Sequence, residues 1–115
     1  MSEEGYENYT EEDFEKFMKQ VDEDKKRHLE TVQLMIEEEN LTWAEQTGAL
    51  FVHAIQGVSA LAQNKNAPMW QRKEAEYVLK SYGEVLDAIN RAIPIIRKKS
   101  QETYRKYSQK LKNDE

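Results

Sequence analysis

The sequence contains no cysteine, only 2 prolines and only 4 glycines among its 115 residues. The lack of cysteine excludes disulfide bonds, thiolate metal sites and cysteine nucleophiles, and the scarcity of proline and glycine removes the residues that most often interrupt helices. No stretch approaches the ~18 consecutive apolar residues of a membrane-spanning helix, and the acidic N-terminal region lacks the apolar core of a signal peptide. We therefore expect a cytoplasmic protein that does not enter a membrane.

Charges of opposite sign are concentrated at opposite ends of the sequence. Residues 1–45 carry 15 acidic and 5 basic side chains, residues 46–90 carry 4 of each, and residues 91–115 carry 3 acidic and 8 basic side chains. The three segments therefore have formal charges of −10, 0 and +5, which add up to the net charge of −5. This asymmetry indicates an acidic head and a basic tail.

Apolar residues recur at intervals of three and four, which predicts helices. Thr10 and Asp13 are typical of a helix N-terminal cap, and an apolar stripe follows from Phe14 to Ile36. The residues Thr42-Trp43-Ala44-Glu45 have the pattern of a capping box, which predicts that the second helix begins at about Trp43. Because this second helix is apolar around most of its circumference, we expect it to be the central helix.

The third predicted helix has the most regular pattern. Its apolar positions from Ala75 to Ile96 alternate in steps of four and three, as in a heptad repeat. Pro94 lies within this pattern, where it removes a backbone donor and crowds the carbonyl group of Asn90, so the helix must end or bend there. The basic residues that follow Pro94 predict either a fourth helix or a bent continuation of the third.

These patterns predict an all-α fold: an antiparallel bundle of three long helices with a basic fourth helical segment after a proline kink or break. The expected helices cover about residues 11–38, 43–63, 69–93 and 95–112, within one domain of residues 10–112. Residues 1–9 are expected to form a flexible acidic arm and residues 113–115 a frayed tail. The first helix is longer than the second, so Phe14, Phe17 and Met18 are expected to overhang it.

The apolar stripes exceed what three unequal helices can bury, which predicts a protein that binds other proteins. We expect a non-enzymatic interaction module, such as an adaptor, inhibitor, accessory or regulatory protein, that forms a homodimer through the overhang or through the heptad face of the third helix. A small viral or mobile-element protein would suit this description. Tryptophan is enriched among residues that dominate interfaces, and the candidate interface residues are Phe14, Phe17, Met18, Val21, Trp43 and Trp70.

The basic C-terminal segment favours a second function, that of a regulator that binds nucleic acid. Its cations could contact phosphates and its tyrosines could stack on bases; the candidate residues are Arg97, Lys98, Lys99, Tyr104, Arg105, Lys106, Tyr107 and Lys110. The negative head would oppose binding of a duplex, or would compete for the tail within one chain. The same pattern of tyrosines and cations would also be expected of a terminal helix that only packs on the core through its tyrosines and binds no nucleic acid.

A third alternative is a Mg²⁺-dependent nucleotide hydrolase that uses Glu38, Glu84 and Asp87. The second helix would contribute only Glu45 to such a site. The two histidines, His28 and His53, lie on different predicted helices and do not form a metal-binding pattern. We therefore expect no catalytic residues, no metal site, no cofactor and no small-molecule substrate.

Overall fold

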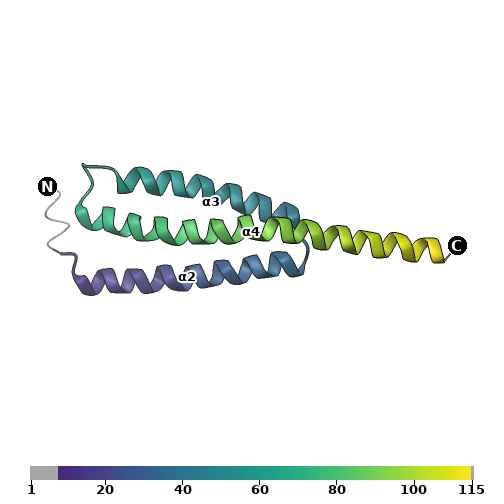
Figure 1. The fold of residues 1–115 in the computed structure, drawn as a ribbon. Coiled ribbons are helices and arrows are strands. Elements are labelled where there is room, and N and C mark those ends of the chain that lie inside the picture. The colour runs from purple at the N-terminus through teal and green to yellow at the C-terminus, as the bar shows by residue number, and fades with distance from the viewer. Residues whose placement is uncertain (1–7, 115) are drawn as a thin grey trace.

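The structure is a computed structural model that describes residues 8–114, and all regular secondary structure in this range is helical (Figure 1). The three helices are α2 (Glu11–Glu37), α3 (Leu41–Ala62) and α4 (Met69–Asn113). They run antiparallel in sequence order, which confirms the predicted bundle of three long helices. The molecule is elongated, measuring 76 × 24 × 14 Å along its principal axes. Most of the expected N-terminal arm, residues 1–7, lies outside the described residues.

The central helix is α4 and not α3. Helix α4 packs along both other helices, whereas α2 and α3 contact each other little (Figure 1). Within α3 only Ala44 and Gly48 are buried, and Leu50 is 68% exposed. The prediction of a central α3 is wrong because only one side of this apolar helix packs on α4, and its other side faces solvent.

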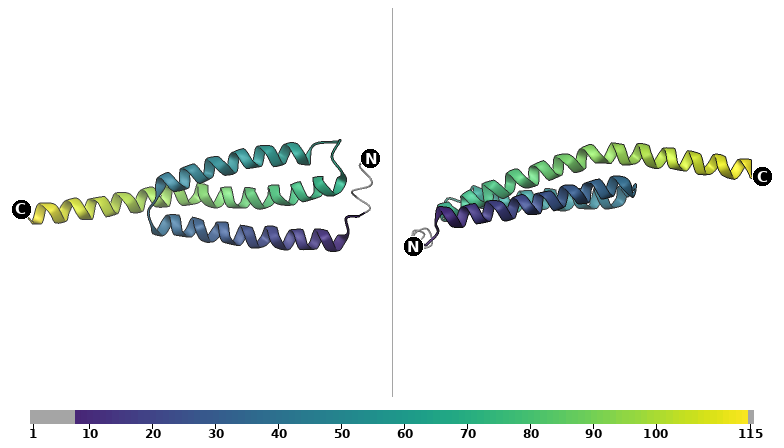
Figure 2. Two further views of the ribbon diagram at one scale, coloured as in Figure 1. Left: turned by 180° about the vertical axis from the view of Figure 1, so that it is seen from behind. Right: turned by 90° about the horizontal axis from the view of Figure 1, so that it is seen from below.

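The core is concentrated at one end of the bundle because α2 and α3 diverge from their connection (Figures 1 and 2). Near this connection Met35 and Ala44 are completely buried, together with Val85, Ile89 and Ile96 of α4. Burial of each large apolar side chain stabilises the fold by about 1.5–3 kcal/mol. We call this end, which includes the α2–α3 connection, the closed end, and the opposite end, where α2 and α4 begin, the open end.

The first residues of the helices are positioned by different caps. Thr10 and Asp13 form the predicted capping box of α2, with the backbone N–H of each donating to the side chain of the other. Helix α3 begins at Leu41, because the Asn40 side chain accepts a hydrogen bond of 3.0 Å from the backbone N–H of Trp43. The cap predicted at Thr42 is therefore wrong, and Thr42 lies inside the first turn of α3.

The turn between α2 and α3 has a Schellman geometry. The backbone N–H of Asn40 donates to the carbonyl group of Met35, and that of Glu39 donates to Ile36. Glu39 adopts a φ angle of 54°, in the left-handed region that usually favours glycine. This tight turn holds the start of α3 against the end of α2.

Helix α4 passes through Pro94 without a break. The two predicted helices of about 69–93 and 95–112 are therefore one helix of 45 residues, and the basic part is its continuation. Both Asn90 and Pro94 are exposed, so water can satisfy the Asn90 carbonyl group that loses its helical donor. Helix α4 is curved, and its convex side faces away from α2 and α3 (Figure 2).

Candidate protein interface

The C-terminal part of α4 extends beyond the other two helices (Figure 1). Where α4 leaves the bundle, the Thr103 hydroxyl group donates a hydrogen bond of 2.7 Å to a carboxylate oxygen of Glu39. We call residues 104–113 the projecting segment. It does not fold back over the overhang expected on the first helix.

The projecting segment carries an uncovered apolar stripe formed by Tyr104, Tyr107 and Leu111. These side chains are 71%, 62% and 50% exposed, respectively. At about 100° per residue they lie on the same face of α4 as Ile89 and Ile96, which are completely buried in the core. The face of α4 that packs against α2 and α3 therefore continues past the ends of these helices and loses its cover.

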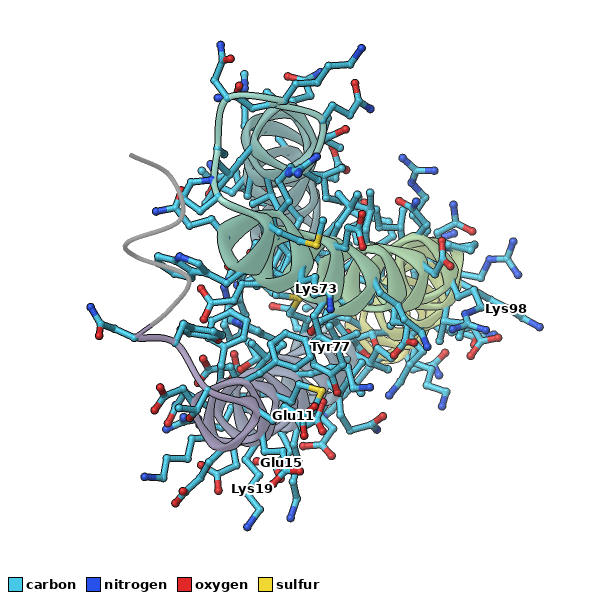
Figure 3. The ribbon with its side chains drawn as sticks, turned by 90° about the vertical axis from the view of Figure 1, so that its left-hand side faces the viewer. Glu11, Glu15, Lys19, Lys73, Tyr77 and Lys98 are labelled. Atoms are coloured by element: carbon cyan, nitrogen blue, oxygen red, sulfur yellow. The ribbon has the colours of Figure 1, made fainter. Side chains whose placement is uncertain are left out.

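Cations occupy the remaining faces of this part of α4. Arg97 lies 3.9 Å from Glu45, and it is the only one of the seven cations between residues 97 and 112 for which the described part of the chain provides an ion pair. Lys98 points away from α2 and α3 (Figure 3). The structure thus separates the candidate nucleic-acid residues into two groups, because Tyr104 and Tyr107 share the apolar stripe and most of the cations lie elsewhere.

The expected overhang of α2 is covered by the beginning of α4. Phe14 packs edge to face on Tyr77 with ring centroids 6.4 Å apart. Phe17 and Met18 are half-buried, and Val21 is buried within the chain. Helix α2, with 27 residues, does extend beyond α3, with 22 (Figure 1). The beginning of α4 covers this extension, so the C-terminal part of α4 is the part of the molecule that extends beyond both other helices.

The two tryptophans lie at opposite ends of the bundle, as their positions in antiparallel helices require. Trp43 is half-buried and packs against the core cluster at the closed end. Trp70 is half-buried at the open end, where Tyr9 stacks on it with ring centroids 4.7 Å apart.

The hydroxyl group of Tyr9 donates to Glu74, and burial together with this bond raises the pKa of Tyr9. Tyr9 therefore ties the end of the predicted flexible arm to α4.

A second apolar surface lies at the open end, where α2 and α3 diverge. The groove between them has α4 as its floor, and it is lined by Phe17, Val58, Leu61, Ala75 and Val78. A shallower hollow farther along α3 includes Leu50. The lining of the groove also includes Glu74, whose carboxylate already accepts the hydrogen bond from Tyr9.

The carboxylates of the hydrolase alternative are not brought together. Glu84 accepts a hydrogen bond of 2.8 Å from Lys25, and this bond lowers the pKa of Glu84. Glu38 is the C-cap of α2 at the closed end. Among residues 8–114 the structure places no three His, Cys, Asp or Glu side chains in a group that could hold a metal ion.

The position of His28 is that of a packing residue. Its ring lies edge to face against Phe51, with ring centroids 5.1 Å apart. Asp24, the only carboxylate at a helical metal-binding spacing from it, pairs instead with Arg27 at 2.6 Å.

The sequence interpretation omitted Leu111 from the candidate interface. Steps of four and three residues connect Ile89, Ile93 and Ile96. Two successive steps of four then lead through Ser100 to Tyr104, and the alternation resumes at Tyr107 and Leu111. This continuity of the pattern across Pro94 was the available signal.

No family model, curated protein or solved structure matches this chain. Within the described residues, no helix combines the length and the apolar character that crossing a membrane requires.

Proposed function

We propose that the protein is a non-enzymatic interaction module that pairs with a second copy of itself through the apolar stripe of the projecting segment. The observation that carries this proposal is the exposure of Tyr104, Tyr107 and Leu111 on the face of α4 that is buried elsewhere along the helix. Large apolar side chains that continue a core face into solvent are typical of an interface.

The spacing of the stripe is suited to antiparallel pairing. Tyr104 and Leu111 are equally distant in sequence from the midpoint between Tyr107 and Ser108. In an antiparallel pair with its two-fold axis at this midpoint, Tyr104 of each copy packs on Leu111 of the other, and Tyr107 lies beside the axis. A parallel pair would instead place each tyrosine against its own equivalent.

The length of the projecting segment also fits this arrangement. Ten residues of helix span ~15 Å, so each segment would end near the Glu39 carboxylate of the other copy. Lys110, which lies beside the stripe, would then approach the acidic run Glu37–Glu39 of the other copy, and this offsets part of the repulsion between the two basic segments. The contact is small compared with the about 1,200–2,000 Å² of a stable specific interface, so the pairing is expected to be weak and reversible.

Sedimentation velocity over a range of concentrations tests the pairing. We expect the wild-type protein to shift from monomer to dimer as its concentration rises, and Tyr107→Glu to remain monomeric. The matched control is Gln109→Glu, which adds the same charge to the same segment on the opposite face of α4 and should dimerise like the wild type. A wild type that is monomeric at every concentration would overturn the proposal.

Because the sequence contains no cysteine, introduced cysteines can test directly whether the two projecting segments pair antiparallel or parallel. We expect a mixture of the Tyr104→Cys and Leu111→Cys variants to form a disulfide-linked dimer efficiently, and each variant alone to cross-link poorly. Strong cross-linking of Tyr104→Cys with itself would indicate parallel pairing. A dimer that persists in Tyr107→Glu would place the interface elsewhere, with the groove at the open end as the next surface to test.

A further inference from the structure

A row of cations follows the outer face of α4. Arg91, Lys98, Arg105 and Lys112 are spaced seven residues apart, and all four are exposed. A spacing of seven residues corresponds to two helical turns, so the row stays on one face of α4 and has a length of ~32 Å. The four side chains form no ion pair within the described part of the chain.

This row points away from the apolar stripe. At about 100° per residue, Lys98 and Arg105 lie on the side of α4 opposite to Tyr107, and Lys98 points away from both other helices in Figure 3. The row therefore remains accessible whether or not the stripe is covered by a second copy. Glu102 is the one acidic side chain beside the row between Lys98 and Lys112.

The acidic beginning of α2 lies far from the C-terminal part of this row, whereas Glu39 and Glu45 of the acidic head lie beside α4 at Thr103 and Arg97. The beginning of α2 contacts α4 at Tyr77, as the pair Phe14–Tyr77 shows, and the 28 residues from Tyr77 to Arg105 correspond to ~42 Å of helix. Charges are screened over ~8–10 Å at physiological salt. Screening over this distance removes repulsion by Glu11, Glu12 and Asp13 in the first turn of α2. Glu39 and Glu45 contact Thr103 and Arg97, which lie on other sides of α4 than Lys98 and Arg105 at about 100° per residue.

We infer that the outer row Arg91, Lys98, Arg105 and Lys112 is a docking surface for the phosphate backbone of double-stranded DNA. The length of the row, ~32 Å, is close to the ~34–36 Å of one turn of the duplex. The row is rigid because it belongs to a single helix, and an α-helix fits the major groove of B-DNA. Lysine and arginine that contact phosphates position a protein without reading sequence, so the binding is expected to be non-specific.

The affinity for a fluorescein-labelled DNA duplex of about 20 base pairs, measured by anisotropy at several salt concentrations, tests this inference. With four to six phosphate contacts, the slope of log K against log salt concentration is expected to be about −4 to −5. Replacement of the row by glutamine (Arg91→Gln, Lys98→Gln, Arg105→Gln and Lys112→Gln together) should weaken binding more than about tenfold and reduce the magnitude of the slope by about 3–4.

The matched control replaces four exposed lysines elsewhere by glutamine: Lys19, Lys26, Lys65 and Lys73. This variant has the same net charge as the row variant, and it should bind the duplex within about threefold of the wild type. Circular dichroism of both variants checks that the helices are retained. Equal weakening in the two variants, or no binding of the wild type at about 50 mM salt, would overturn the inference.

Anionic vesicles that contain phosphatidylserine distinguish a nucleic acid from a lipid surface. We expect the protein to bind the duplex at lower protein concentration than the vesicles, because the outer face of the row lacks a broad apolar side that could insert into lipid. Tighter binding to the vesicles would reassign the row to a membrane surface.

Discussion

At the scale of single residues, Glu39 combines backbone strain with a tertiary contact. Its φ angle of 54° lies in a region that costs a residue with a side chain roughly 1–2 kcal/mol relative to glycine. Its carboxylate accepts the hydrogen bond from Thr103 at the point where the projecting segment begins. The strained residue is therefore also the one that joins the α2–α3 turn to α4.

We predict that Glu39→Gly raises the free energy of unfolding by about 0.5–1 kcal/mol, because relief of the strain exceeds the loss of one exposed hydrogen bond. Urea denaturation measures the change. The neighbouring Glu38 has a φ angle of −85°, so Glu38→Gly relieves no strain and is expected to lower the stability. If both variants had a lower free energy of unfolding than the wild type, the hydrogen bond from Thr103 would contribute more to stability than the relief of backbone strain at Glu39.

Tyr9 gives the protein a dependence on alkaline pH. Burial and the bond to Glu74 raise its pKa above the ordinary value of 10.0, so the folded state holds the phenolic proton more tightly than the unfolded state. The corresponding stability is present in full below about pH 10 and is lost as the pH rises above it. The raised pKa of Tyr77, caused first by its hydrogen bond to Asp22, acts in the same direction.

We therefore predict that Tyr9→Phe is less stable than the wild type at neutral pH by about 1 kcal/mol, and that this difference shrinks as the pH rises above about 10. Thermal unfolding followed by circular dichroism at each pH provides the measurement. Tyr6→Phe changes a tyrosine of the same N-terminal region and serves as the comparison. A constant difference between Tyr9→Phe and the wild type across this range would contradict the prediction.

At the scale of elements, much of the fold was predictable from local patterns. The periodicity of three and four identified three long helices, and Thr10 with Asp13 identified the start of α2. The start of α3 was misplaced because Asn40 and Thr42 both fit a cap, and only the Schellman turn at Glu39 selects Asn40. The central position of α4 depends on how the helices diverge, which local spacing does not encode.

The candidate interface was only partly predictable. The sequence contains Tyr104, Tyr107 and Leu111 at core spacing, but a core face and an uncovered face have the same pattern. Which of the two applies depends on Pro94, since a break there would let the basic segment fold back. The structure shows a continuous helix because Pro94 and Asn90 lie on the solvent side.

We predict that Pro94→Ala straightens α4 and raises the free energy of unfolding by about 1–3 kcal/mol, because it restores the hydrogen bond to Asn90 and removes the clash of the proline ring. Chemical denaturation gives the stability, and small-angle X-ray scattering gives the change in maximum dimension. Pro68 lies before the first residue of α4, so Pro68→Ala should leave the curvature unchanged. A Pro94→Ala variant with the scattering profile of the wild type would indicate that packing on α2 and α3 sets the curve.

At the scale of the whole molecule, packing is uneven along the long axis. The completely buried side chains Met35, Val85, Ile89 and Ile96 all belong to the cluster at the closed end. The open end instead relies on half-buried aromatic contacts such as Phe14 with Tyr77, and on exposed polar pairs such as Tyr77 with Asp22. Exposed pairs contribute little to stability, so the open end should be the less stable one.

We predict that amide hydrogen exchange is slowest in α4 between Val85 and Ile96 and faster in the second half of α3 than in its first half. The projecting segment should exchange fastest within α4, and it should become protected as the protein concentration rises and the stripe is covered. Mass spectrometry of peptides from labelled protein measures this. Uniform protection along α3 would contradict the proposed gradient.

The placement of acidic residues at the beginning of α2 and basic residues at the tip of α4 makes this 76 Å rod an electric dipole. At low ionic strength, where the screening length reaches ~30 Å, approaching molecules would be oriented with a positive tip toward a negative end. A head-to-tail contact of this kind leaves one free end on each molecule, so further molecules can add and form an open row. Physiological salt removes this long-range guidance and leaves the short contact between stripes, so the protein is expected to change from open rows to closed pairs as salt is added.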